Sequence, residues 1–343
     1  MECPNLEEVR FGTGMEVIPN KAFSSCQQLQ VVWFTSGQKS VSTRAFYDCP
    51  ELTTVSGITS SVKTIYQGAF QGSRITAFDL SSVEGIYDYA FKDCTRLSDI
   101  GSGFSSSLDE IGMGAFENCS MLVIPAIPES VKIIGERAFY GTKLPEPRLF
   151  IPRTVQKIGS YAFSHCTGTA ELRFGNRFGD HVKMGDGVFS ESGFDTVLMS
   201  GAGVDDDTEV GAFSGLHSLP KYTFYGCTKL TEVQLPVGEV TRIKSYAFEN
   251  CSSLTSIDLP EDYGELGQNV FKGCTSLSTI IFRNTNNVVQ GNDLDYGVQY
   301  DQHPAAGLQY LTQDFTVYVP SMWLDEYKRH THWMTIADHF VGM

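Results

Sequence analysis

Cysteine is the residue type in this chain that most strongly suggests chemistry. Nine cysteines among 343 residues could form disulfides, bind a metal ion or supply a nucleophile. No Cys-x-x-Cys pair occurs, and every cysteine after Cys3 lies three residues after a phenylalanine. This spacing favours packing, so we predict mostly free, buried thiols in a tight turn beside a backbone carbonyl. Some disulfides, or a metal site, are the alternatives.

Two other groups of residues could bind a metal ion. Residues 201–209 include three consecutive aspartates, Asp205, Asp206 and Asp207, and hard cations prefer carboxylate oxygens. Their spacing is not that of an EF-hand, so a solvated acidic loop is the favoured interpretation. The histidines near the C-terminus lack an obvious third-ligand spacing; they are His330, His332 and His339. We therefore predict no metal and no cofactor.

The chain also lacks the motifs of the common enzyme classes. It has no P-loop, nucleophile elbow, zinc-protease motif or G-x-G-x-x-G before a helix, and these motifs carry phosphate binding, acyl transfer, metal hydrolysis and dinucleotide binding. Paired carboxylates from neighbouring segments could in principle work together, but catalysis needs them in a pocket, which no pattern here marks. We predict no catalytic residue and no enzymatic activity.

The elements that position the cysteines form a repeat marked by phenylalanine, usually preceded by alanine. An aliphatic residue or methionine lies five positions before each of these anchor phenylalanines, and leucine often lies six positions after it, as in "YAFENCSSLTSIDLP" from Tyr246 to Pro260. The anchors recur at intervals of 21 to 26 residues, with one interval of 35. They are Phe23, Phe46, Phe70, Phe91, Phe116, Phe139, Phe163, Phe189, Phe224, Phe248 and Phe271.

This period predicts a leucine-rich-repeat solenoid. A repeat of 20 to 29 residues with Leu-x-x-Val-x-Leu is typical of coils that each supply one short strand to a parallel sheet. One coil cannot bury its own apolar edge, so the coils must stack. We predict an α/β horseshoe-type solenoid of about twelve coils, mostly strand and irregular structure, with a capped C-terminal end.

The repeat unit, aliphatic-x-x-x-Ala-Phe-x-x-Cys-x-x-Leu-x-x-Val-x-Leu-Pro, resembles the BspA-like class of leucine-rich repeats over roughly residues 3–283. The resemblance implies a secreted or surface-attached bacterial protein that takes part in adhesion and binds host or bacterial proteins. Cys3 falls inside a coil whose phenylalanine would precede residue 1, and the first five residues do not resemble a signal peptide. The expected localisation, secreted or at the bacterial cell surface, therefore rests on the resemblance.

Breaks in the repeat indicate the domain organisation. We predict a solenoid over residues 1–283 with an insertion at about 200–214, where Phe213 resembles an anchor but Phe224 fits the repeat better. Residues 284–314 are rich in Asn, Gln and Asp and are expected to form an irregular loop. Residues 315–343 are expected to form a final strand and a cap. The cap contains a short helix over 321–329, because an uncapped last coil would expose its core.

The residues between the buried strand positions should face outward, and function on a solenoid lies on such exposed positions. Most of them are small or polar, and Trp33 and Phe150 stand out as large aromatics; on one coil Ile124 and Ala126 are expected to face outward. Large aromatic and arginine side chains are typical of interface hot spots, although single exposed apolar residues are also ordinary surface. The candidate ligand-binding residues are Trp33, Arg148, Phe150, Glu171, Arg173 and Leu198, of which Arg148, Glu171 and Arg173 should be neighbours.

Composition restricts the partners. The net charge of −15 argues against nucleic acid, whose phosphates need patches of Lys and Arg. No apolar run has the length of a membrane span. We predict a monomeric, non-catalytic protein that recognises a protein or glycan ligand of a host or bacterial surface through the repeat sheet. A spacer segment within a larger surface protein is the alternative function.

Overall fold

The coils are seen in a computed structural model that describes residues 3–57, 59–175, 182–199, 218–235, 242–261, 263–291, 304–331 and 333–343. These residues group into two compact units. Unit 1 comprises Met1–Pro145 and Thr154–Thr167, and unit 2 comprises Glu146–Arg153 and Gly168–Met343. The predicted insertion near 200–214, with Asp205, Asp206, Asp207 and Phe213, lies outside the described residues, as does His332.

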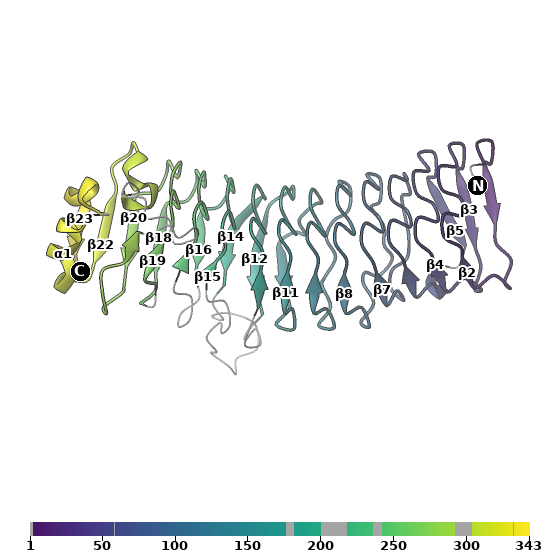
Figure 1. The fold of residues 1–343 in the computed structure, drawn as a ribbon, viewed down its shortest axis with the longest axis horizontal. Helices are drawn as coiled ribbons and strands as arrows, with labels where there is room; N and C mark the ends of the chain where they lie inside the picture. The colour runs from purple at the N-terminus through teal and green to yellow at the C-terminus, as the bar shows by residue number, and fades with distance from the viewer. Residues whose placement is uncertain are drawn as a thin grey trace. The chain divides into compact units, whose positions relative to one another are not determined.

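Unit 1 consists of coils that each contribute to two parallel sheets (Figure 1). The first sheet has the order β1 (Glu8–Arg10), β3 (Val31–Phe34), β5 (Thr54–Gly57). In later coils of the unit the same position holds isolated parallel bridges, such as Ala77 with Asp99. The short 3-10 helix η1 (Thr59–Ser61) follows β5.

The second sheet of unit 1 is built from two-residue strands. In each strand, the residue that faces the core is the aliphatic one five positions before the anchor phenylalanine. Neighbouring strands pair in parallel, in chain order. They are β2 (Val17–Ile18), β4 (Ser40–Val41), β6 (Thr64–Ile65), β7 (Gly85–Ile86), β8 (Glu110–Ile111), β9 (Ile133–Ile134) and β11 (Lys157–Ile158). The fold class is the predicted solenoid, but these coils carry this second strand as well as the expected one.

Unit 2 repeats the plan with longer strands. One sheet has the order β10 (Arg148–Ile151), β12 (Ala170–Phe174), β14 (Phe194–Leu198), β16 (Glu232–Gln234), and another has the order β18 (Ser256–Leu259), β20 (Thr279–Phe282), β22 (Thr316–Val319), β23 (Phe340–Gly342). The two-residue strands of this unit are β13 (Lys183–Met184), β15 (Ser218–Leu219), β17 (Arg242–Ile243), β19 (Glu265–Leu266) and β21 (Gln290–Gly291). The last four form a parallel sheet.

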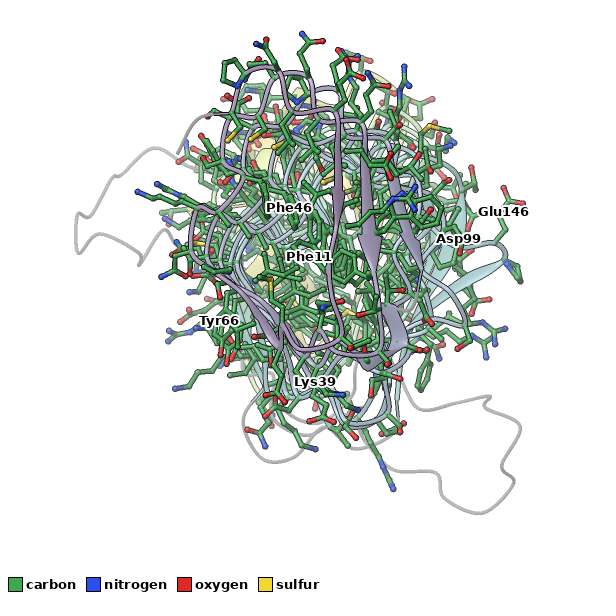
Figure 2. All side chains as sticks on the ribbon, turned by 90° about the vertical axis from the view of Figure 1, so that its right-hand side faces the viewer. Phe11, Lys39, Phe46, Tyr66, Asp99 and Glu146 are labelled. Atoms are coloured by element: carbon green, nitrogen blue, oxygen red, sulfur yellow. The ribbon has the colours of Figure 1, made fainter. Side chains whose placement is uncertain are left out.

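The anchor phenylalanines form the core of each unit. Consecutive rings lie nearly parallel, as for Phe91 and Phe116 at 5.4 Å between centroids and 5° between planes. In unit 2 the rings of Phe224 and Phe248 repeat this arrangement at 5.4 Å. Figure 2 shows Phe46 and Phe11 within the coils, where their centroids are 6.5 Å apart. Each ring covers the apolar edge that its neighbour cannot bury alone, so the ladder holds the coils together.

The turn around each anchor has an unusual backbone. The residues two before and two after the phenylalanine have positive φ, for example Arg44 at 54° and Asp48 at 54° around Phe46. This conformation directs alternate N–H groups along the stack: those of Arg44, Phe46 and Asp48 donate to carbonyls of the next coil at 2.9, 2.8 and 2.8 Å. Left-handed backbone costs roughly 1–2 kcal/mol for an L-residue, and these hydrogen bonds offset the cost because the N–H groups would otherwise be buried without partners.

The C-terminal cap covers the last coil. The predicted final strand and helix are present as β22 and as η4 (Ser321–Trp323) followed by α1 (Leu324–Arg329). The buried rings of Tyr327 and Trp333 pack against Phe282 of β20 at 5.9 and 5.5 Å. The 3-10 helix η5 (Met334–His339) then leads into β23, which extends the sheet beyond the final strand we expected.

The segment predicted as an irregular loop at 284–314 contains repeat-like structure. Within it β21 pairs with β19, and the 3-10 helix η3 (Pro304–Tyr310) places the carbonyl of Ala306 2.9 Å from the N–H of the anchor Phe271. The backbone thus forms the next turn of the solenoid, although no anchor phenylalanine marks this turn in the sequence. No helix of the described residues has the length and apolar character that a bilayer span requires.

Candidate binding site on the repeat sheets

The cysteines lie in the turns, where the sequence placed them, and serve packing. All nine are unpaired thiols, and the eight that follow an anchor phenylalanine are buried. From Cys49 onward, each donates its S–H to the carbonyl of the anchor phenylalanine in the preceding coil; the Sγ atoms of Cys119 and Cys251 lie 3.1 Å from the oxygens of Phe91 and Phe224. The thiol thus provides the partner that this carbonyl needs.

Burial makes these thiols poor nucleophiles. Desolvation, opposed by weaker backbone hydrogen bonds, raises the pKa of Cys227 to about 12 and that of Cys274 to about 12. Only the thiolate attacks electrophiles or binds metals. Among the described residues no group of three or more His, Cys, Asp or Glu side chains could hold a metal ion. His339, one of the three cap histidines, instead stacks on Phe315 and contacts its carbonyl oxygen through Nδ1 at 2.9 Å.

Five of the six candidate ligand-binding residues meet on one sheet of unit 2. The register places Arg148 beside Glu171 in one row. Phe150, Arg173 and Leu198 lie side by side in a second row across β10, β12 and β14. All five side chains are partly or fully exposed, because the residues between them, such as Leu172, face the core.

Glu171 pairs with two arginines on this sheet, to which Asp195 of β14 and Glu232 of β16 add two further carboxylates. The Glu171 carboxylate contacts the Arg148 guanidinium at 3.4 Å through Oε2 and the Arg173 Nε through Oε1. Glu171 thus joins two arginines beside the aromatic ring of Phe150. An arginine fork next to an aromatic ring is suited to a partner that carries a carboxylate or phosphate.

Trp33, the sixth candidate, lies in unit 1 on β3. Its side chain is 38% exposed, and the Arg10 guanidinium of the neighbouring strand β1 lies 5.0 Å from its ring centroid. It shares the sheet β1–β3–β5 with small polar neighbours such as Ser56. Trp33 and the five residues of unit 2 are therefore two separate candidate positions, and their roles in binding remain predictions.

One residue expected to face outward is buried. Ile124 is 1% exposed, whereas Val123 is 49% exposed. The prediction placed the strand by counting from Phe116, but the N–H of Ile124 donates to Lys143 and only a single bridge forms here, through Val123. The backbone departs from a regular strand at this point, so that the side chain of Ile124 is buried and that of Val123 is exposed.

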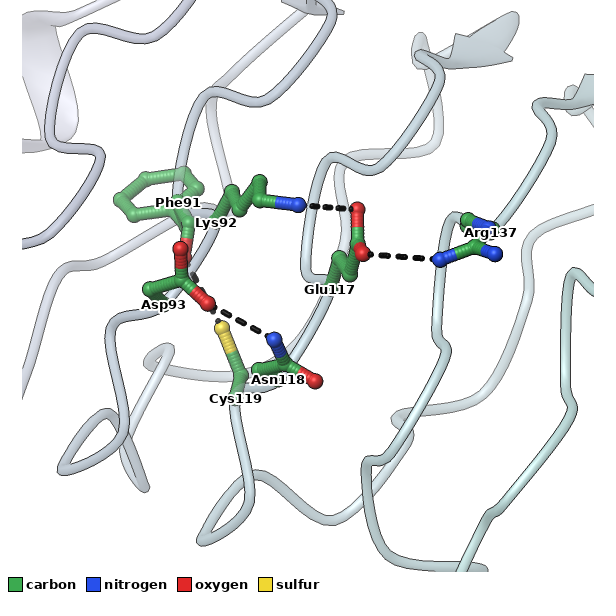
Figure 3. A network of polar contacts seen from close by, with 7 residues as sticks. All are labelled: Phe91, Lys92, Asp93, Glu117, Asn118, Cys119 and Arg137. Carbon is green, nitrogen blue, oxygen red and sulfur yellow. Dashed lines mark hydrogen bonds and ion pairs between the residues drawn. The ribbon is translucent and has the colours of Figure 1, made fainter.

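The anchor turns of unit 1 also carry a polar cluster that we did not predict. We call it the turn cluster, and it consists of Lys92, Glu117, Arg137, Tyr140 and Tyr161. Figure 3 shows the Glu117 carboxylate between two cations from the coils on either side, with Oε2 2.8 Å from Lys92 Nζ and Oε1 3.4 Å from Arg137 Nη1. Glu117 is 4% exposed and is the one charged side chain among the buried residues that the structure describes. The sequence does contain a signal for the turn cluster, because its charged and aromatic residues lie one or two positions from the anchor phenylalanines.

The family follows from a direct comparison of the sequence. The profile of the BspA type leucine rich repeat region matches with six copies, over residues 1–122, 86–202 and 208–294. The chain belongs to this family. No match was found among curated proteins.

Solved structures confirm the fold of this BspA-type repeat protein. A leucine-rich repeat protein from Bacteroides ovatus is similar with a TM-score of 0.55 and 23% identity, covering 100% of this chain and 94% of that one. The pneumococcal vaccine antigen PcpA is similar with a TM-score of 0.50 and 16% identity, covering 99% of this chain and 88% of that one. At such identities the likeness concerns the fold.

Proposed function

We propose that this BspA-type repeat protein is a non-catalytic binding or adhesion protein, secreted or held at a bacterial cell surface. Its ligand is a protein or glycan of a host or bacterial surface, recognised by the exposed face of β10, β12 and β14. The observation that supports this most is the juxtaposition of Phe150, Arg173 and Leu198 in one exposed row, with Arg148 and Glu171 in the next. Aromatic and arginine side chains are enriched where interfaces derive most of their binding energy.

The mechanism is complementarity without movement of the scaffold. The alternate residues of these strands, such as Leu149, Leu172 and Val197, are buried in the core, so the backbone under the exposed row is held in place. A preorganised surface loses little entropy when a ligand binds. The partly exposed Arg148 guanidinium would pair with a carboxylate of the ligand and help to orient it on the sheet.

The test is an array of host-matrix proteins and glycans, probed with the wild-type chain and with the double variant Phe150→Ala/Arg173→Ala. We expect the variant to lose about tenfold or more in affinity for any ligand found, since truncating a hot-spot residue costs about 2 kcal/mol or more. The matched control is Arg283→Ala, which removes an arginine from an exposed ion pair with Asp258 beside another sheet. Equal binding by the double variant would reject this face, and binding to nothing on the array would favour the spacer function.

A further inference from the structure

The turn cluster of unit 1 presents an arginine held between two aromatic rings. The Arg137 Cζ atom lies 5.1 Å from the ring centroid of Tyr140 and 5.7 Å from that of Tyr161. Tyr140 is in turn contacted edge-on by the ring of His165 at 4.9 Å. Cation–π contacts restrict the motion of a guanidinium, and the arginine fork then matches two oxygens of a carboxylate or of a tetrahedral oxyanion such as sulfate.

Most hydrogen-bonding capacity of Arg137 is unused by its neighbours. Within the part of the chain that the structure describes, its one polar side-chain contact is from Nη1 to Glu117, at the long distance of 3.4 Å, and the side chain is 44% exposed. A guanidinium has five N–H donors. Several donors of this partly exposed guanidinium are therefore left for a ligand.

The charge of the turn cluster favours an anion. Lys92 and Arg137 both pair with the carboxylate of Glu117, and the Asp93 carboxylate of the same network accepts a hydrogen bond from Asn118 (Figure 3). Arg137, 44% exposed, is the position in this cluster where an anion could pair with a cation. An anionic ligand would meet complementary charge here, while most of the acidic surface would repel it.

We propose that the turn cluster is a second binding site, separate from the repeat sheet, for an acidic sugar: a glycan residue that bears a carboxylate or sulfate group. Arg137 pairs with the oxyanion, and Tyr140 and Tyr161 contact the sugar ring and its hydroxyls. A tyrosine has an apolar body and a polar tip, which matches a sugar ring with its C–H faces and peripheral hydroxyls. An acidic peptide would match the charge of Arg137 but would leave the phenol rings and hydroxyls with less to contact.

The test measures binding of four probes by titration calorimetry, with saturation-transfer NMR to identify the contacted protons. The probes are sialyllactose, a sulfated lactose, uncharged lactose and a hexaglutamate peptide. We expect sialyllactose, sulfated lactose or both to bind, lactose to bind at least about tenfold more weakly, and Arg137→Met to weaken the acidic sugar about tenfold or more, as loss of a charge-assisted bidentate contact implies.

Control variants separate binding from folding. Arg137→Lys keeps the charge beside Glu117 but lacks the planar fork, so it should also weaken the acidic sugar while its thermal unfolding stays close to wild type. Arg242→Met removes an arginine from an exposed pair with Glu265 at 2.7 Å and should change nothing. Preference for hexaglutamate, equal binding of lactose, binding unaffected by Arg137→Lys, or no binding of either acidic sugar would each overturn the proposal. Binding that is lost in Phe150→Ala/Arg173→Ala but kept in Arg137→Lys would assign it to the repeat sheet.

Discussion

At the scale of single residues, the cysteines show how a reactive side chain becomes structural. Each thiol from Cys49 onward donates to the carbonyl of an anchor phenylalanine one coil earlier, which ties two coils together through one weak hydrogen bond. In turns without cysteine the position is occupied by a small hydroxyl residue; Thr142 Oγ1 donates to Phe139 at 2.7 Å and also contacts Cys166 Sγ at 3.4 Å. The requirement is a small side chain with a donor, and the sulfur is one way to meet it.

The buried thiols should make the protein sensitive to alkali. Burial raises the pKa of Cys94 to about 12, whereas a thiol in an unfolded chain has a pKa of about 8.5. Above pH 8.5 the unfolded chain loses this proton and the folded chain keeps it. Stability is therefore fully present below pH 8.5 and falls as the pH rises toward 12, by at most about 1.4 kcal/mol per pH unit for one thiol.

The measurement is urea unfolding between pH 8 and 11 for the wild type and for Cys94→Ser. Serine keeps the small donor but does not ionise in this range, so we expect a shallower loss of stability in the variant. Cys3, which is only partly buried, provides the comparison as Cys3→Ser. A pH dependence that is the same in all three proteins would show that Cys94 does not carry the effect.

At the scale of elements, the turn that carries each anchor is the unusual part of the repeat. Its two left-handed residues direct N–H groups to the next coil, yet most of these positions hold ordinary residues such as Tyr89 and Arg137. Glycine occupies some equivalent positions, such as Gly68 and Gly72. The repeat thus tolerates strain at many turns, because the hydrogen-bond ladder and the phenylalanine stack outweigh it.

Glycine at an exposed left-handed position should therefore stabilise the fold. Lys21 has φ of 53° and an exposed side chain, and its N–H would still donate to Thr43. We expect Lys21→Gly to raise the free energy of unfolding by up to about 1 kcal/mol, since relief of left-handed strain exceeds the added entropy of the unfolded chain. Lys63→Gly, at a residue without positive φ, should instead destabilise. Urea midpoints of both variants test this, and a lower midpoint for Lys21→Gly would contradict it.

At the scale of the whole molecule, stability should be local. Each coil contacts its neighbours along the stack, so a repeat protein behaves nearly as a one-dimensional series of units. Phe116 is fully buried and stacks on Phe91 and Phe139 at 5.4 and 5.5 Å. Its loss would remove one of the stacking partners of each of these two rings and leave a cavity between three coils of unit 1.

We expect Phe116→Ala to destabilise unit 1 by about 3–5 kcal/mol, the usual cost of truncating a buried phenylalanine. Amide hydrogen exchange should show lost protection in the coils around Phe91, Phe116 and Phe139. The amides of β18, β20 and β22 in unit 2 should keep wild-type protection. An equal loss of protection in both units would show global cooperativity in place of the local behaviour of stacked repeats.

Much of this arrangement could be predicted because the repeat is marked by side chains that recur at a regular spacing. The anchor phenylalanines, the inward strand positions and the placement of the cysteines follow from spacing, and the neighbour relation of Arg148, Glu171 and Arg173 follows from stacking equivalent positions. The misplaced Ile124 and the missed strand β21 have a common cause. Where backbone hydrogen bonds set the path of the coil and no side chain marks it, counting from the last anchor loses the register.

The sequence by itself determined the solenoid, its family and the packing role of the thiols, because each depends on residue types that recur at a fixed period. The tertiary structure decided the register of the strands and the contacts that the exposed side chains make. It brought Phe150, Arg173 and Leu198 into one row, left Trp33 with Arg10 in unit 1, and assembled Arg137 with Tyr140 and Tyr161. The physical reason is that buried positions accept few residue types and recur with each coil, so the sequence shows them as a pattern. Contacts between exposed side chains of neighbouring coils depend on their individual positions, which the repeat period does not specify.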